Sequence, residues 1–243
     1  MRNLLLCLGF ILSMTVLNCE VRGADTLVFT TPAAPPLSQE NQRGFIDQVV
    51  GEALARMGYQ LKVTHLPAER ALINANNGVD DGDLNRIAGL SKVYPNLIQI
   101  PERTFDMEFA AFTKKGDITT TRWDDLKPYT VGIITGWKIL ERNIPAGTST
   151  TKVKNPEQLF TLLENNRADI ILYGKWQGLQ YIQEHHLTEV KLLKPSLARM
   201  DMFVYFHKKH QALTDKFSNT LREMKVDGSY QKIYDQILTP LNQ

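Results

Sequence analysis

The feature that most constrains this chain is an alternation of strand and helix patterns that occurs twice along the sequence. The first round has strand patterns at 27–31, 59–66, 81–86 and 97–100, separated by helix patterns over 44–57 and 68–76. The second round has strand patterns at 129–135, 150–153, 168–173 and 190–193, with helices that begin at Trp137, Pro156 and Trp176. Strands that alternate with helices favour a parallel sheet covered by helices. The sequence therefore predicts an α/β protein.

Two apolar strand patterns stand apart from these rounds. Residues 107–112 follow the first round, residues 202–206 follow the second, and helix patterns over 212–224 and 230–238 end the chain. One strand that leads out of a first unit and one that leads back to it would join two lobes. We therefore predict a hinged, two-lobed architecture with a cleft between the lobes.

The first residues have the pattern of a secretory signal peptide. A basic start at Arg2 is followed by an almost uncharged apolar run over 4–17 and by small residues at 23 and 24. The run is too short for a comfortable transmembrane helix. We expect residues 1–24 to be removed on export to the periplasm. Both cysteines, Cys7 and Cys19, lie in this segment, so we expect no disulfide and a fold held by core packing.

Cys19 has a second interpretation, as the acylated cysteine of a lipoprotein. That modification usually requires a small residue just before the cysteine, and Asn18 stands there, so we do not expect a lipid anchor. The whole chain has a formal net charge of +2, and loss of two arginines and one glutamate with residues 1–24 would lower it to +1. A net charge this close to zero does not indicate binding to nucleic acid or to a membrane surface.

A strand pattern followed by glycine and a helix start occurs at Thr135, Gly136 and Trp137. Free backbone N–H groups at such a turn favour an anion. We predict that these residues offer a hydroxyl, N–H groups and an aromatic wall to a ligand; the alternative is a tight turn with Trp137 in the core. Tyr173 and Trp176 follow the strand over 168–172, where a stacking or hydrogen-bonding group is expected. Core packing is again the alternative.

Two arginines of the first lobe are candidates for binding a carboxylate. Arg86 ends the strand pattern 81–86, where an open α/β sheet places its crevice, and a guanidinium can bind a carboxylate through two parallel hydrogen bonds. Its alternative is a surface arginine paired with Asp83. Arg70 comes early in the helix that follows Pro67, and its alternative is a solvated helix face.

We expect no metal and no cofactor. His185 and His186 are adjacent, so on a helix their side chains point in different directions. No other His or Cys completes a plausible ligand set with them, and His207 and His210 are equally unsupported as ligands.

A series of short segments carries a resemblance to a known family. They are Pro-Pro-Leu at 35–37, Gly-Phe-Ile-Asp at 44–47, Pro-Ala-Glu-Arg-Ala-Leu at 67–72, Gly-Val-Asp-Asp-Gly at 78–82, Trp-Asp-Asp-Leu at 123–126, Val-Gly-Ile-Ile-Thr-Gly at 131–136, Ala-Asp-Ile-Ile at 168–171 and Asp-Gly-Ser-Tyr at 227–230. In this order and spacing the chain resembles the family 3 extracellular solute-binding proteins. These are type II periplasmic receptors of bacterial ABC importers, many of them for polar amino acids. The similarity covers nearly all of the chain after residue 24.

The resemblance implies a type II periplasmic-binding-protein fold. Each lobe would be a mixed sheet flanked by helices, and two crossover strands would join the lobes. One lobe would comprise 25–112 plus 203–243 and the other 116–199, with hinges near 112–116 and 199–203. A solute would be held between lobes that close on it, because it binds the closed form better and stabilises that form.

Three positions depart from the family pattern. In the amino-acid binders an arginine of a Thr-x-x-Arg segment holds the substrate carboxylate, and Val93 falls near that position. The aspartate that usually binds the amino group is replaced by Tyr173 and Gly174. Leu37 stands where a first-lobe aromatic is expected, and its position makes it a candidate ligand contact. The substrate is therefore less well specified than the fold.

The resemblance implies a periplasmic substrate-binding protein for a small polar, carboxylate-bearing, amino-acid-like solute. Its partner would be an ABC permease in the inner membrane, and we expect a monomer that is not an enzyme. Two alternatives stay open. One is a receptor of the same fold that signals to a membrane sensor. The other is a periplasmic enzyme similar to cyclohexadienyl dehydratase, with Glu69 or Glu102 as acid or base.

Overall fold

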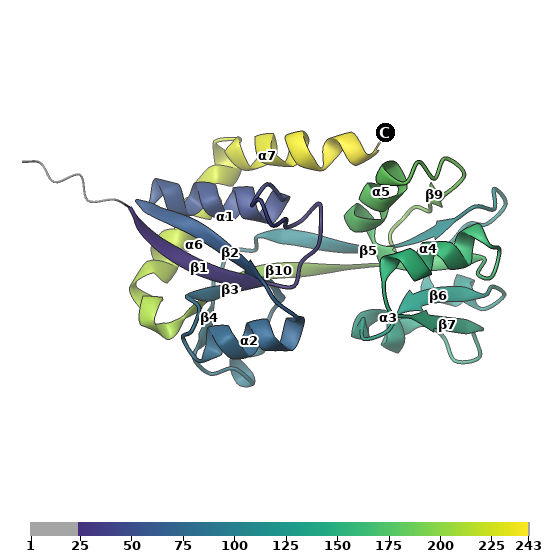
Figure 1. Ribbon diagram of the computed structural model, residues 1–243, viewed down its shortest axis with the longest axis horizontal. Helices are drawn as coiled ribbons and strands as arrows, with labels where there is room; N and C mark the ends of the chain where they lie inside the picture. Colours follow the sequence, from purple (N-terminus) through teal and green to yellow (C-terminus); the bar gives the residue numbers. More distant parts are fainter. Residues whose placement is uncertain (1–23, 243) are drawn as a thin grey trace, which may run out of the picture.

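The computed structural model describes residues 24–242, which form two lobes joined by two long strands (Figure 1). The predicted signal peptide, with Cys7 and Cys19, lies outside the described residues except for Ala24. Within residues 24–242, none of the helices has the length and apolar character that a membrane crossing requires.

Lobe 1 is built around three parallel strands. β1 (Asp25–Thr31) lies between β2 (Tyr59–His65) and β3 (Gly82–Ile87) and pairs in parallel with both. α1 (Phe45–Arg56) and α2 (Ala68–Asn76) cover opposite faces of this sheet (Figure 1). The other elements of this lobe are the 3-10 helix η1 (Leu90–Lys92), β4 (Leu97–Gln99), η3 (Lys208–Leu213), α6 (Thr214–Val226), α7 (Ser229–Ile237) and η4 (Thr239–Asn242).

The core of lobe 1 is filled by the apolar side of α1. The ring of Phe45 is fully buried and lies 5.4 Å from Phe105, 5.5 Å from Tyr230 and 5.7 Å from Tyr234, measured between ring centroids. Burial of a side chain of this size stabilises the fold by roughly 1.5–3 kcal/mol. These contacts tie α1 to the C-terminal helix α7 and to the strand that leaves the lobe.

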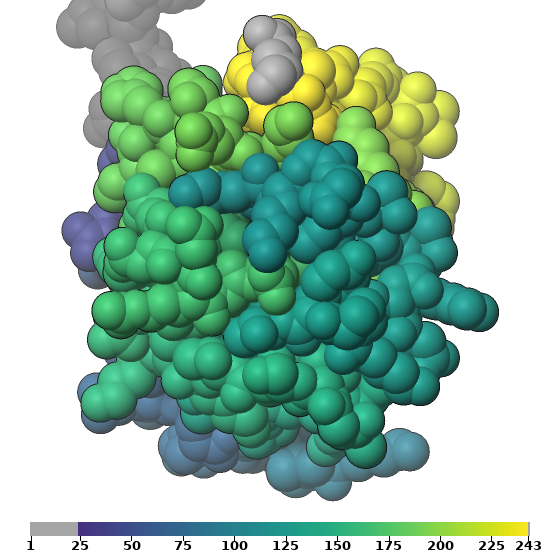
Figure 2. Space-filling view, turned by 90° about the vertical axis from the view of Figure 1, so that its right-hand side faces the viewer, coloured from purple at the N-terminus to yellow at the C-terminus, as the bar shows by residue number. Residues whose placement is uncertain are grey.

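Lobe 2 repeats the parallel arrangement on a smaller scale. β6 (Val131–Ile134) lies between β7 (Thr150–Val153) and β8 (Ile170–Gly174) and pairs in parallel with both. The remaining elements are η2 (Trp123–Leu126), α3 (Lys138–Asn143), α4 (Pro156–Glu164), α5 (Lys175–Glu184) and β9 (Lys191–Leu192). Figure 2 views this lobe from its outer end, where its teal and green residues make up most of the face.

Two antiparallel strands join the lobes. β5 (Phe105–Thr113) pairs with β10 (Ala198–His207) in the register Phe105–Met202 to Phe109–Ala198. β10 continues into lobe 1, where it pairs with β3 and β4, and β5 continues into lobe 2, where it pairs with β8 and β9. The sheet therefore has the order β2-β1-β3-β10-β5-β8-β6-β7.

The two predicted crossover strands are confirmed, and both are longer than predicted. The residues that join the lobes are 105–109 paired with 198–202, whereas Phe112 and Thr113 are already paired with strands of lobe 2. The predicted limits of the lobes remain a prediction. One expectation is corrected: the strands predicted at 97–100 and 190–193 do not extend the parallel sheets, because β4 and β9 pair antiparallel with β10 and β5.

Candidate functional site

The strand directions place the carboxyl ends of both sheets at the junction of the lobes. β5 runs from lobe 1 to lobe 2, and β8 is antiparallel to it, so β8 and its parallel neighbour β6 run toward lobe 1. β10 runs back to lobe 1 and β3 is antiparallel to it, so β3, β1 and β2 run toward lobe 2. In open α/β sheets, ligands bind outside the carboxyl ends of the strands. Here two such edges face each other.

A cavity of about 650 Å³ lies at this junction. Its lobe 1 wall is the loop that follows β1, residues 33–41, together with His65 at the carboxyl end of β2. Glu184 of α5 lines it from lobe 2. The volume is within the range of small-molecule sites.

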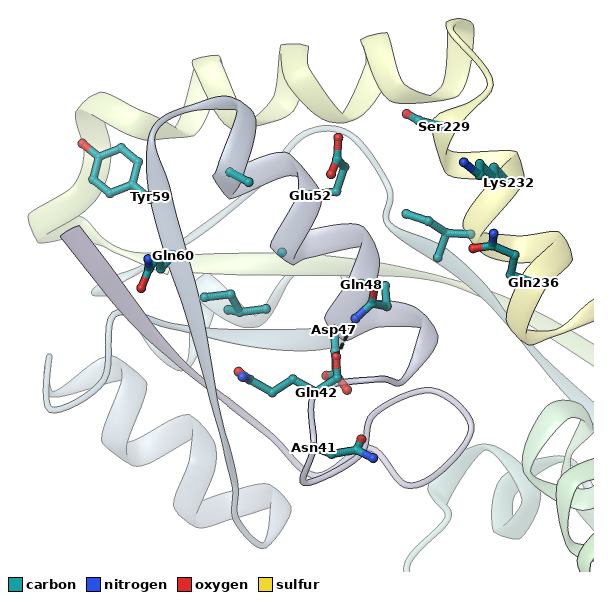
Figure 3. A pocket seen from close by; sticks show the side chains of 14 residues that line it. Asn41, Gln42, Asp47, Gln48, Glu52, Tyr59, Gln60, Ser229, Lys232 and Gln236 are labelled. Carbon is teal, nitrogen blue, oxygen red and sulfur yellow. Dashed lines mark hydrogen bonds between the residues drawn. The ribbon is translucent and has the colours of Figure 1, made fainter. Parts of the chain in front are cut away.

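A second cavity, of about 690 Å³, lies within lobe 1 between α1, the edge strand β2 and α7 (Figure 3). Gln48 and Glu52 of α1, Tyr59 of β2, and Lys232 and Gln236 of α7 are among the residues that line it. All of its walls belong to one lobe, so closure of the lobes would not enclose a ligand there. The cavity at the junction is therefore the better candidate.

The turn after β6 forms the lobe 2 side of the junction. Thr135 and Gly136 are exposed, and Gly136 has φ +92°, a conformation that glycine adopts at little cost. The N–H of Gly136 donates to Glu141 Oε1 at 3.2 Å, and Lys138 lies 2.9 Å from Glu141 Oε2. These two groups hold the pKa of Glu141 at about 2, Lys138 having the larger effect. The predicted anion site thus already binds a carboxylate of the protein itself.

An aromatic group stands behind this turn. The half-buried ring of Trp137 lies 5.0 Å from Tyr173 at an angle of 33° and 5.8 Å from Phe109 in a T-shaped contact. Tyr173 is 4% exposed, and burial raises the pKa of its hydroxyl. The structure therefore brings Thr135, Gly136, Trp137 and Tyr173 together, with only Trp137 of the two aromatics offering exposed ring surface.

Trp176 and Leu37 are buried by packing and offer no accessible surface to a solute. Trp176 is 1% exposed and packs in a T-shaped contact, 5.7 Å between centroids, on Tyr234 of α7. Leu37 is fully buried in the core of lobe 1. The side chains that we predicted as ligand contacts at these two positions are enclosed by the protein, so core packing is the better assignment for both.

Arg86 is committed to an ion pair inside lobe 1. Its Nε and Nη2 each lie 2.7 Å from a carboxylate oxygen of Asp83, and Nη2 also donates to the carbonyl oxygen of Ala68 at 3.0 Å. Asp83 is fully buried, and that burial raises its pKa to about 6 although Arg86 opposes the shift. The pairing with Asp83 that we weighed as the alternative is present, but it is buried rather than at the surface.

A bulge in β3 makes this pair possible. Side chains alternate between the faces of a strand, so residues 83 and 86 of a regular strand would point to opposite sides. Asn85 has φ +61°, and the register against β10 shifts between Phe203 and Tyr205. One extra residue on β3 thus returns Arg86 to the face of Asp83, and the pair fastens β3 to the first turn of α2.

Arg70 remains exposed on the first turn of α2. The chain enters α2 directly after the carboxyl end of β2, so this turn belongs to the edge that faces lobe 2 (Figure 1). The neighbouring Glu69 accepts a hydrogen bond of 2.9 Å from the hydroxyl of Tyr94. Of the two candidate arginines, Arg70 is therefore the one whose guanidinium is accessible to a solute.

The sequence analysis missed Ser38, Asp47 and His65, which form a hydrogen-bonded chain behind the cavity. His65 could have been noticed, because it is the last residue but one of the strand pattern 59–66, close to the edge where Arg86 ends the pattern 81–86. Ser38 and Asp47 carry no such signal, because their contact with His65 depends on the path of the loop between β1 and α1.

Comparison with known proteins identifies the fold. No family model matches the chain. An uncharacterized protein of Shewanella oneidensis is 28% identical over 192 residues, which are 76% of this chain and 72% of that protein. Among solved structures, an ancestral arginine-binding protein bound to arginine has a TM-score of 0.69 at 23% identity and covers 89% of this chain and 98% of its own.

Two further solved structures are similar over the same extent. The substrate-binding protein of an amino acid ABC transporter has a TM-score of 0.66 at 19% identity, with 88% of this chain and 99% of that chain covered. A histidine kinase sensor domain with similarity to periplasmic binding proteins has a TM-score of 0.70 at 18% identity, with 89% and 97% covered. The chain has the two-lobed periplasmic-binding-protein fold that the resemblance predicted, and at the level of the fold that prediction is confirmed.

Proposed function

We propose that the protein is an exported solute-binding protein that captures a small polar, carboxylate-bearing, amino-acid-like solute between its lobes and delivers it to an ABC importer. This proposal rests mainly on one observation. The carboxyl ends of the strands of both sheets face each other, and the lobes that hold these sheets are joined by two strands, β5 and β10. A link of this kind lets the lobes approach each other, and a solute that contacts both lobes stabilises the closed arrangement.

The carboxylate would bind to exposed groups on the two edges. Of the two candidate arginines of lobe 1, Arg70 is the exposed one, and Thr135 offers an exposed hydroxyl from lobe 2. Trp137 would supply an aromatic wall behind the turn. The known binding of arginine by a protein of similar fold, and the place of another in an amino acid transporter, support a solute of amino-acid type.

A ligand screen by thermal unfolding tests this proposal. A solute at about 100 times its dissociation constant adds about 2.7 kcal/mol to the free energy of unfolding, which for a chain of this length raises the melting temperature by roughly 5–10 °C. The Arg70→Met variant should melt like the wild type without solute and shift less with it. Absence of a shift with every amino acid, organic acid, amine and small peptide would contradict the proposal.

A second candidate function is reception for a membrane sensor. It is favoured by the similarity to a histidine kinase sensor domain. Uptake of a radiolabelled solute by cells that lack the protein separates the two roles, since the loss of an importer component lowers uptake. Unchanged uptake together with a lost transcriptional response to the solute would favour the sensor.

We propose binding rather than catalysis. The two carboxylates considered as acid or base are engaged elsewhere: Glu69 accepts from Tyr94, and Glu102 lies 2.5 Å from Lys225 and 3.6 Å from Arg222. A turnover assay on prephenate-like compounds checks this, and product formation would contradict it.

A further inference from the structure

We infer that the junction cavity binds a positively charged group of the solute, with His65 as a fixed hydrogen-bond acceptor and Glu40 and Glu184 as counter-charges from opposite lobes. The inference rests on the proposed function and specifies its substrate class: an ammonium or guanidinium group on a short aliphatic stem. It follows from the hydrogen-bond chain behind His65, the charges around the cavity and the apolar part of its wall.

The chain begins at Asp47, which is 2% exposed at the start of α1. Its Oδ2 accepts the backbone N–H groups of Gln39 at 2.8 Å and Gly44 at 3.0 Å, and its Oδ1 accepts the hydroxyl of Ser38 at 2.6 Å. Three donors thus point at one carboxylate. An ionised carboxylate can only accept, so the hydroxyl proton of Ser38 is directed to Asp47.

The next bond fixes the tautomer of His65. Ser38 Oγ lies 2.9 Å from His65 Nε2. A hydroxyl has a single proton, and that proton is directed to Asp47, so Ser38 accepts and Nε2–H of His65 donates. A neutral imidazole with its proton on Nε2 keeps its lone pair on Nδ1. His65 is half-buried and lines the cavity, so Nδ1 is the atom that can accept from a ligand.

The charges around the cavity favour the same kind of ligand. Glu40 and Glu184 are both exposed and line it from lobe 1 and lobe 2, and among residues 24–242 no Lys or Arg lines it. Two carboxylates on opposite lobes repel each other and so oppose closure, whereas a cation between them attracts both and favours closure. A cationic group would therefore bind the closed form better than the open one, as capture of a solute requires.

The rest of the wall fits a short aliphatic stem. Ala33, Ala34 and Pro35 line the cavity beside the polar residues. A solute with an amine or guanidinium at one end would place that end against His65 Nδ1 and its methylene groups along this apolar segment. Its carboxylate end would extend toward Arg70, which follows His65 and the carboxyl end of β2 in the chain.

Matched pairs of probes isolate the charge. Isothermal titration calorimetry would compare L-arginine with L-citrulline and L-lysine with L-norleucine, since each pair differs chiefly in the positive charge. We expect the cationic member to bind at least about tenfold more tightly. The double variant Glu40→Gln/Glu184→Gln should lower the affinity for the cationic member about five- to tenfold and leave the neutral member within about twofold. Glu164→Gln, an exposed carboxylate of lobe 2 outside the cavity, is the matched control and should leave both unchanged.

Ser38 acts through His65, so its test needs a readout of the imidazole. In the wild type, the ¹⁵N chemical shifts of His65 should identify a protonated Nε2 and an unprotonated Nδ1. Ser38→Ala should mix the two tautomers and weaken binding of the cationic probe, while melting of the free variant confirms that it folds. His65→Gln, which keeps an acceptor, should bind the cationic probe more tightly than His65→Ala.

The outcomes separate this inference from the proposed function. Equal affinities within both probe pairs, or an affinity for the cationic probe that the double glutamine variant leaves unchanged, would overturn the inference and keep solute binding. Binding of L-glutamate or succinate alone would do the same. If no probe binds, including these two anions, the inference fails; the proposed function fails as well only if no solute of the thermal-unfolding screen shifts the melting temperature.

Discussion

Replacement of Arg86 by methionine tests whether this arginine supports lobe 1 or holds the solute. In the wild type its Nε and Nη2 each lie 2.7 Å from Asp83, which is fully buried. Methionine keeps part of the side-chain volume and removes the charge, so the carboxylate of Asp83 is left in the interior without its partner. Removal of one partner of a buried ion pair costs about 3–5 kcal/mol, and we expect a loss of about 3 kcal/mol at pH 8.

The loss should depend on pH, because a protonated Asp83 needs no counter-ion. Burial raises the pKa of Asp83 to about 6 even beside Arg86, and without the guanidinium the pKa rises further. Arg86→Met should therefore lose much less stability at pH 5 than at pH 8. The double variant Asp83→Leu/Arg86→Met replaces both charges by apolar groups and should recover most of the loss at pH 8.

Urea unfolding followed by tryptophan fluorescence measures these differences at both pH values. Arg70→Met is the matched control, because Arg70 is exposed and its replacement should change the free energy of unfolding by no more than about 0.5 kcal/mol. If Arg86→Met unfolds at the wild-type urea concentration at pH 8 and fails to bind the solute, Arg86 is a ligand residue and our assignment is refuted.

Three other measurements address packing, titration and the aromatic wall. A Cβ at Gly178 would lie 2.3 Å from the ring of Phe112, so Gly178→Ala should cost about 1–3 kcal/mol in urea unfolding, whereas Gly116→Ala, which meets open space, should cost almost nothing; equal costs would refute the packing argument. The pKa of Asp83 is raised from 3.8 to about 6, so between these pH values the folded state binds more protons than the unfolded state. Ionisation of Asp83 should therefore lower the free energy of unfolding as the pH rises from 4 to 6, by about 3 kcal/mol at most. Asp83→Asn should remove this pH dependence, and an unchanged profile of stability against pH would contradict the argument. Solute binding should change the emission of Trp137, which borders the proposed site, and Trp137→Phe should abolish that change; a change that persists would place the solute elsewhere.

Local signals in the sequence were sufficient to predict most of the helices and strands. Asn155, Pro156 and Glu157 predicted the start of α4, and Asn155 Oδ1 does accept the N–H of Gln158 at 2.9 Å. The part of β10 between Ala198 and Asp201 was missed. This part alternates between half-buried and exposed residues, because a two-stranded link has no core on its outer side, and its sequence therefore lacks an apolar run.

The site was harder to predict than the fold because its contacts depend on irregular backbone. The period of a strand separates Asp83 from Arg86, and only the bulge at Asn85 brings them together. The sequence predicted that the turn at Gly136 favours an anion of a ligand, whereas the carboxylate that accepts its N–H in the structure is Glu141, five residues further along the chain. Ser38 and His65 are 27 residues apart, and no spacing rule relates a loop residue to the end of the next strand.

The helix α5 connects the proposed site to a contact between the lobes. Near its start, Trp176 packs on Tyr234 of α7, so helices of the two lobes are in contact on this side of the junction. At its end, Glu184 lines the cavity opposite Glu40. Between these ends α5 also faces η4 of lobe 1, because Leu179 and Ile182 line a cavity together with Leu241. A cation bound between Glu40 and Glu184 would therefore add a charge contact between α5 and lobe 1 to the packing that already joins them.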